Sequence, residues 1–314
     1  MNWNFSIVGF VLLSAAVLRA QSPSGSAPLP DSPGATITSP SGDISELARG
    51  KRWKEVAALA ETNHHQDPSD PTALYWLGIS RLKLNQPVAS VQAFRVAEKL
   101  GLNTALSHEG LGLAYYDLNQ FYLFEEQMKK AAALDPHDST PYFYLGLYRW
   151  TIRSDAAGAL EFFEQALRRH PDDWKSLYQA GNCLEQVGKL VEARDRYTKA
   201  IALVQKNGDP FGWPYQGMAR LLLDDKPEEA LDFAKKAVAL QPDEYSNHLT
   251  LAKVYERLGN LPDAIREAEA ATTQNPNDST SRYALYKLYR QAGDPRAAGA
   301  LKTFQEVKTL YDRD

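Results

Sequence analysis

The chain has 314 residues, of which 44% are hydrophobic and 24% are charged, and this composition is typical of a folded globular protein. Its formal net charge of -4 does not provide the basic surface that nucleic-acid binding requires, so nucleic acid is not an expected partner. The single cysteine, Cys183, excludes an intramolecular disulfide and a cysteine-based zinc site.

The N-terminus predicts an export signal. Residues 5–18 are almost wholly apolar and carry no charge. This run is shorter than the roughly 20 residues that span a bilayer, but it suits the hydrophobic core of a signal peptide. We therefore predict a signal peptide at residues 1–20, cleaved after Ala20, and an exported protein, periplasmic or secreted, with no stable membrane span after cleavage. The alternative is an uncleaved N-terminal membrane anchor.

Residues 21–42 are mostly Ser, Pro and Gly, with almost no large apolar side chain. Such a segment cannot bury enough surface to offset the entropy lost on ordering, so it predicts a flexible linker.

From about residue 43 onward, the sequence repeats itself. A small residue recurs in steps of 34 to 36 at Gly78, Gly112, Gly146, Gly181, Gly217 and Ala252. An alanine recurs in steps of 34 to 37 at Ala97, Ala131, Ala166, Ala200, Ala237 and Ala271. Small side chains allow two helices to approach closely, both within one unit and between one unit and the next. Because a single helix pair cannot bury its apolar face alone, the units must stack.

This pattern resembles the tetratricopeptide repeat, a helix-turn-helix motif of about 34 residues with the signature W-x2-L-G-x2-Y, A-x3-F and P. One unit carries Leu111, Gly112, Tyr115, Ala131 and Pro136 in register with that signature. The resemblance implies an all-α fold over residues 43–314, a right-handed α-solenoid of stacked antiparallel helix pairs. We expect about seven full units and one partial unit.

Departures from the pattern lie at the two ends and at one junction. Pro40 truncates the first helix of the first unit. The final helix has one apolar stripe (Leu301, Phe304, Val307 and Tyr311), so it can cap the stack itself. Residues 205–214 form the longest segment between repeats and predict an irregular loop.

The sequence contains no signature of catalysis. HExxH, a phosphate-binding glycine loop, G-x-S-x-G and paired CxxC motifs are all absent. His108 and His248 occupy the position of the motif's tryptophan and predict structural roles, whereas the adjacent His64 and His65 point to different helix faces and make a poor metal pair. Cys183 predicts a buried thiol. We therefore expect a non-enzymatic protein with no catalytic residue, cofactor or metal.

In tetratricopeptide repeat proteins, the first helix of each pair lines a concave face whose variable positions contact a partner. Applied to this sequence, the resemblance implies an apolar groove in the second to fourth units and a more polar, basic face in the last units, which carry Lys253, Glu256, Arg257, Lys287 and Arg290. The predicted groove residues are Tyr75, Ile79, Leu82, Leu113, Tyr116, Phe143, Leu147 and Trp150.

The expected function is an interaction scaffold that holds an unidentified protein partner in this groove. A small-molecule or glycan-binding role, or a regulatory subunit of an envelope enzyme or transporter complex, is the alternative. Self-association into a homo-oligomer also stays open.

Overall fold

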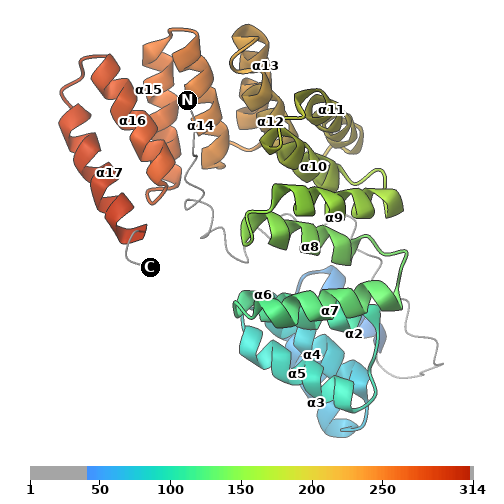
Figure 1. Cartoon of the computed structure of the whole chain (residues 1–314). Helices are drawn as coiled ribbons and strands as arrows, with labels where there is room; N and C mark the ends of the chain where they lie inside the picture. Colours follow the sequence, from blue (N-terminus) through green and yellow to red (C-terminus); the bar gives the residue numbers. More distant parts are fainter. Residues whose placement is uncertain (1–40, 312–314) are drawn as a thin grey trace. The chain divides into compact units, whose positions relative to one another are not determined.

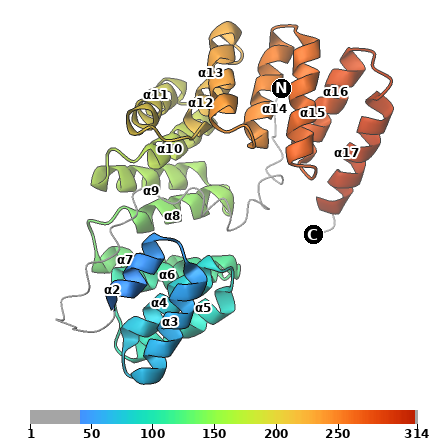
Figure 2. The same ribbon diagram turned by 180° about the vertical axis from the view of Figure 1, so that it is seen from behind.

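The computed structural model describes residues 41–311, and within that range all regular secondary structure is α-helical (Figures 1 and 2). The predicted signal peptide and nearly all of the predicted linker lie outside the described residues. The helices are α2 (Ser41–Arg49), α3 (Trp53–Gln66), α4 (Pro71–Lys83), α5 (Pro87–Lys99), α6 (Ala105–Asp117), α7 (Phe121–Leu134), α8 (Thr140–Thr151), α9 (Ala156–Arg169), α10 (Trp174–Gln186), α11 (Leu190–Asn207), α12 (Trp213–Leu222), α13 (Pro227–Leu240), α14 (Tyr245–Arg257), α15 (Leu261–Gln274), α16 (Ser279–Gln291) and α17 (Ala297–Tyr311).

The helices form pairs, as the repeat pattern predicts. We call the even-numbered member of each pair the first helix and the odd-numbered member the second helix. Each of the first helices α4, α6, α10, α12, α14 and α16 packs on the second helix that follows it. First helices also contact one another, α4 with α6, α10 with α12, α12 with α14 and α14 with α16. The first helices within each of these contacting pairs therefore lie side by side.

The chain divides into two compact units, and the division falls inside α8 after Gly146. In the described residues, the N-terminal unit comprises residues 41–146 with Arg168–His170, and the C-terminal unit comprises Leu147–Leu167 and residues 171–311. Each unit is a stack of helix pairs with its own buried apolar side chains.

Local sequence explains where the helices begin. The Asp70 side chain accepts a hydrogen bond from the Thr72 backbone N–H at the start of α4, and Pro71 occupies its first turn, where no N–H is needed. Thr104 and Ser107 form a reciprocal capping box at the start of α6. Asp173 caps α10 by accepting from the Ser176 N–H at 3.0 Å.

The recurring small residues are sites of close helix contact, as predicted. A Cβ on Gly78 would lie 2.8 Å from the Phe94 ring, and one on Gly181 would lie 2.5 Å from the Tyr197 ring. The six recurring alanines, from Ala97 to Ala271, are all 0% exposed. The repeat period therefore marks the positions at which helix packing leaves no room for a larger side chain.

The structure corrects two boundaries. The predicted loop at residues 205–214 is only five residues long, because α11 continues to Asn207 and α12 begins at Trp213. Val204 is buried on the additional turn of α11, and Gly208 ends that helix in the left-handed conformation with φ 69°. At the other end of the chain, α2 already begins at Ser41, inside the predicted linker.

The two ends otherwise behave as expected. The short helix α2 contributes the buried side chains of Ile44 and Ala48. On α17, Val307 is buried and the Phe304 ring lies 5.2 Å from the Tyr283 ring of α16. Between residues 41 and 311, no helix is both long and apolar enough to cross a bilayer.

Candidate partner-binding surface

The predicted groove residues differ in how much surface they offer. Tyr75 and Ile79 on α4, Leu113 on α6 and Trp150 on α8 are half-buried. The other four, Leu82, Tyr116, Phe143 and Leu147, are between 0% and 6% exposed. A partner could therefore contact only the first group without a rearrangement of the core.

Packing within the helix pairs explains the second group. The Tyr116 ring meets Phe121 and Phe124 of α7 edge-on, with centroids 5.5 and 5.2 Å away. Tyr116 thus contributes to the core of its pair instead of standing on an open surface. The repeat motif in the sequence predicts which residues lie on the partner face. It does not predict how much of each side chain is buried by a neighbouring helix.

A buried carboxyl group lies near Tyr75, one of the predicted groove residues. Glu109 on α6 is 7% exposed, and its Oε1 has no hydrogen-bond partner among the described residues. Burial raises the pKa of Glu109 well above its usual range, and a hydrogen bond with Asp138 raises it further. Burial likewise raises the pKa of the nearby Tyr75 phenol. These shifts favour the uncharged forms of both groups, so neither group adds a charge to the predicted apolar groove.

The first helices of the C-terminal unit carry a polar network. Arg220 on α12 donates from Nε to Glu185 Oε1 at 2.9 Å, and from Nη2 to Glu185 Oε2 at 2.8 Å and Asn182 Oδ1 at 2.7 Å. The Tyr197 hydroxyl of α11 lies within hydrogen-bond distance of the same two side chains, 2.8 Å from Asn182 Oδ1 and 2.9 Å from Glu185 Oε2. This network fixes a guanidinium group between α10 and α12.

Two lysines continue the basic character along the next first helices. Lys253 on α14 is half-buried, and burial, followed by repulsion from Arg220 and Lys287, lowers its pKa. Lys287 on α16 pairs with Glu256 at 3.4 Å. The basic residues that the sequence placed on the last units thus lie close enough to repel one another.

Another lysine is buried at the start of α10. Lys175 is 4% exposed, and its Nζ lies 5.5 Å from the centre of the Trp174 ring and 5.8 Å from that of Phe211. Burial lowers the pKa of Lys175 to about 8, against the opposing charges of Asp173 and Asp209. This burial could not be predicted from the repeat pattern, because Phe211 lies in the segment predicted as an irregular loop.

The two histidines at the tryptophan positions have structural partners, as predicted. His108 contacts Gln127 at 2.6 Å and Asn103 at 2.8 Å. His248 contacts Glu267 at 2.7 Å and the Pro242 carbonyl at 2.8 Å. Each imidazole ring therefore joins a first helix to the second helix that follows it.

Cys183 is fully buried, and burial raises the pKa of its thiol. Among residues 41–311, no three His, Cys, Asp or Glu side chains converge as a metal site would require.

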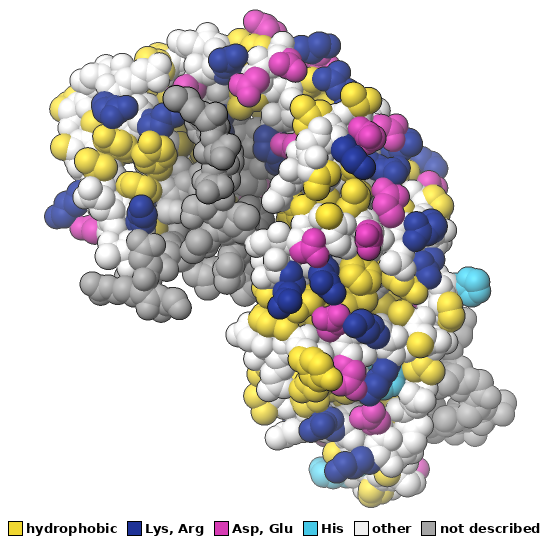
Figure 3. Space-filling view, in the orientation of Figure 1, with side chains coloured by type: hydrophobic (Ala, Val, Ile, Leu, Met, Phe, Trp, Pro, Cys, Tyr) yellow, Lys and Arg dark blue, Asp and Glu magenta, His cyan; other side chains and the backbone are white. Residues whose placement is uncertain are grey.

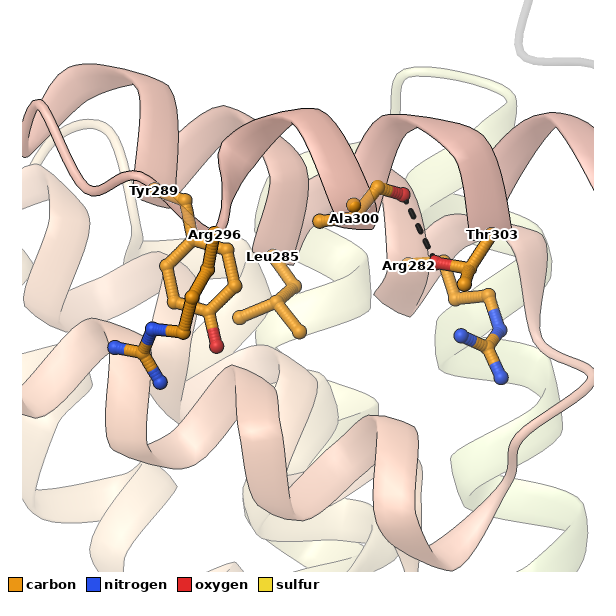
Figure 4. A pocket seen from close by; sticks show the side chains of 7 residues that line it. Arg282, Leu285, Tyr289, Arg296, Ala300 and Thr303 are labelled. Carbon is orange, nitrogen blue, oxygen red and sulfur yellow. Dashed lines mark hydrogen bonds between the residues drawn. The ribbon is translucent and has the colours of Figure 1, made fainter.

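An open cleft of about 360 Å³ lies between α16 and α17 (Figure 4). Leu285 and Tyr289 of α16 face Ala300 and Thr303 of α17, and Arg282 and Arg296 lie near its two ends. Arg296 pairs with Glu269 of α15 at 2.7 Å and lies 4.3 Å from the centre of the Tyr289 ring. Sequence analysis missed this cleft, whose only signal is the run of small residues at 297–300.

Two family models of the tetratricopeptide repeat match the chain, one over residues 162–195 and one over residues 221–288. The chain is 25% identical over 189 residues to DnaJ homolog subfamily C member 7 homolog of Schizosaccharomyces pombe, a match that covers 54% of this chain and 40% of that relative. It is 30% identical over 100 residues to Protein SGT1 homolog of Bos taurus, covering 32% of this chain and 29% of the relative. The chain thus spans less than half the length of these relatives.

Solved structures show the same fold. The APC/C hetero-tetramer Cut9-Hcn1 matches with a TM-score of 0.67 and 16% identity, over 78% of this chain and 48% of that one. Yeast Tom70 matches with a TM-score of 0.56 and 19% identity, over 87% of this chain and 57% of that one. The family models, the 34-residue period and the stacked helix pairs agree, and the chain is a tetratricopeptide repeat protein.

Proposed function

We propose that this protein is a non-enzymatic scaffold that binds a partner polypeptide along its first helices. The observation that carries the proposal is the row of neighbouring first helices α4 and α6, which present Tyr75, Ile79 and Leu113 as half-buried apolar side chains. Half-buried apolar side chains on a rigid helical layer suit a polypeptide that buries its own apolar groups against them.

The distribution of charge on the surface favours binding at a local site over non-specific association across the whole surface. In the view of Figure 3, Lys and Arg side chains are interspersed with Asp and Glu over the visible described residues. Mixed charges of this kind favour solubility over non-specific association.

Export is part of the proposal and rests on residues 5–18. N-terminal sequencing of the protein from its native host tests it. A mature chain that begins at Gln21 supports export, whereas retention of residues 1–20 in a membrane fraction supports the anchored alternative.

The partner-binding proposal is tested by affinity capture from native extract. The bait is the mature chain with Ile79→Ser and Leu113→Ser, compared with the parent. A matched control places Val88→Ser and Leu134→Ser on the second helices of the same unit, where these side chains are 58% and 45% exposed. The proposal predicts that a protein recovered by the parent is lost with the first-helix variant and kept by the control.

Recovery of the same protein by all three baits would refute this use of the first helices. A small ligand or glycan that raises the unfolding temperature, with no protein captured, would support the alternative function instead.

A further inference from the structure

His248, near the start of α14, lies between two groups that accept hydrogen bonds. Its Nε2 is 2.8 Å from the Pro242 carbonyl oxygen in the turn before α14, and its Nδ1 is 2.7 Å from Oε2 of Glu267 on α15. A carbonyl oxygen and an ionised carboxylate have no proton to donate. A neutral imidazole carries one ring proton and can therefore satisfy only one of these two acceptors.

The surroundings of Glu267 favour its ionised form. Arg266 donates from Nε and Nη2 to Oε1 of Glu267, at 3.3 and 3.1 Å, which leaves Oε2 to His248. Arg266 also pairs with Asp263, whose charge in turn interacts with Lys235 of α13. Among the described residues, no charged side chain of α12, α13 or α16 forms a hydrogen bond or ion pair with His248 or Glu267. The second proton therefore belongs on the ring, and the folded protein holds His248 as an imidazolium.

This ion pair is largely shielded from solvent. The side chains of His248 and Glu267 are each 11% exposed. The Pro242 carbonyl also accepts a hydrogen bond from Nε2 of Gln274 at the end of α15. If the ring lost its second proton, a carboxylate or a carbonyl oxygen would face a nitrogen lone pair in a poorly hydrated site, which is unfavourable. Loss of that proton should therefore break one of the two contacts.

His108, at the equivalent position of α6, has no such requirement. Both rings contact a side chain 19 residues further along the chain. The partners of His108 are the amide side chains of Gln127 and Asn103. An amide can present either its oxygen or its NH2 group, so a neutral ring can be satisfied at both nitrogens. The two histidines occupy the same repeat position but differ in the number of protons that their partners require.

We propose that His248 and Glu267 form a proton-dependent latch, which holds α14 against α15 and against the turn before α14. The inference concerns the opening of one helix pair and does not rest on the proposed function. Above about pH 6.5 the imidazole of the unfolded chain is neutral, so the folded chain then holds one more proton. The stabilisation is complete below this pH and is lost as the pH rises, by up to about tenfold in the opening equilibrium per pH unit.

Hydrogen exchange of the full chain, measured from about pH 6 to 9 and corrected for the intrinsic exchange rate, tests the latch. Amides of α14 and α15 should open more readily as the pH rises. Glu267→Gln supplies the amide partner that His108 already has, so this variant should keep the pair closed and lose the pH dependence. His108→Gln is the matched control in the N-terminal unit and should leave the pH dependence of α14 and α15 unchanged.

Nitrogen NMR of the histidine rings gives a second, independent readout, and His248→Gln assigns the signals of His248. At about pH 7, above the value at which a free imidazole loses its second proton, both ring nitrogens of His248 should carry a proton. A ring protonated on Nε2 alone would overturn the inference, and so would equal pH dependence of exchange in the parent and Glu267→Gln. Neither measurement involves a partner, so failure of the latch would leave the scaffold proposal untouched.

Discussion

At the scale of single residues, two ionisable side chains are buried, and burial disfavours the charged form of each. Glu109 lies in the N-terminal unit, and Lys175 lies beside the Phe211 ring in the C-terminal unit. Neither belongs to the repeat signature, and neither could be identified from spacing alone. The position of Glu109 on the partner face was predictable, but its burial and its hydrogen bond with Asp138 were not.

Lys175 allows a test of its burial by pH. Its pKa of about 8 lies below the ordinary lysine value of 10.5, so between these values the unfolded chain binds a proton that the folded chain does not. The free energy of unfolding should therefore rise with pH across this window. Below pH 8 it is lowered by the full cost of burying the charged amine. Lys175→Met should raise the free energy of unfolding at pH 7 by about 1–2 kcal/mol.

Chemical denaturation of parent and variant from pH 7 to 10 measures this effect. The gap between the two proteins should narrow as the pH rises, and a gap that is constant with pH would show that the amine is not buried.

At the scale of helices, much of the packing could be predicted. The recurring glycines and alanines located the closest helix contacts because a side chain larger than these would overlap its neighbour. The length of α11 could not be predicted, since its last turn depends on burial of Val204 within the stack. The burial of Tyr116 could not be predicted from the motif either, because it depends on packing against the aromatic rings of α7.

Two glycine substitutions separate close packing from helix propensity. Gly181→Ala would place a Cβ 2.5 Å from the Tyr197 ring, whereas a Cβ on Gly299 of α17 would meet no atom within 4 Å. We expect Gly181→Ala to lower the free energy of unfolding by about 1–3 kcal/mol. Gly299→Ala should raise it by about 0.5–1 kcal/mol, because alanine is the better helix former.

Denaturant titration of the two variants beside the parent measures both changes. A stabilising Gly181→Ala would mean that α10 and α11 are not in close contact at this point.

At the scale of the whole molecule, stability in a repeat protein comes from contacts between neighbouring helices. Helix α17 has a neighbour in α16, but no helix between residues 41 and 311 follows it, and many of its side chains are exposed. Amides of α17 should therefore exchange with solvent faster than those of α10 and α11 in the same unit. Hydrogen exchange of the full chain measures this order, and uniform protection across the C-terminal unit would contradict it.

The fold does not by itself identify a partner, because the same helix pairs occur in proteins of very different roles. What this sequence adds is the contrast between apolar first helices in the N-terminal unit and basic first helices in the C-terminal unit. That contrast was visible in the sequence. The burial of half of the predicted groove residues was not.

The central claim, that a polypeptide lies along the first helices, is tested most directly by photo-crosslinking in the native host. A photoreactive phenylalanine analogue is placed at Ile79 or Leu113 on first helices, and at Val88 on the second helix α5 as the control. The scaffold account predicts a discrete crosslinked protein from the first two positions and none from the third. Crosslinks from position 88 alone, or from none of the three positions, would contradict it.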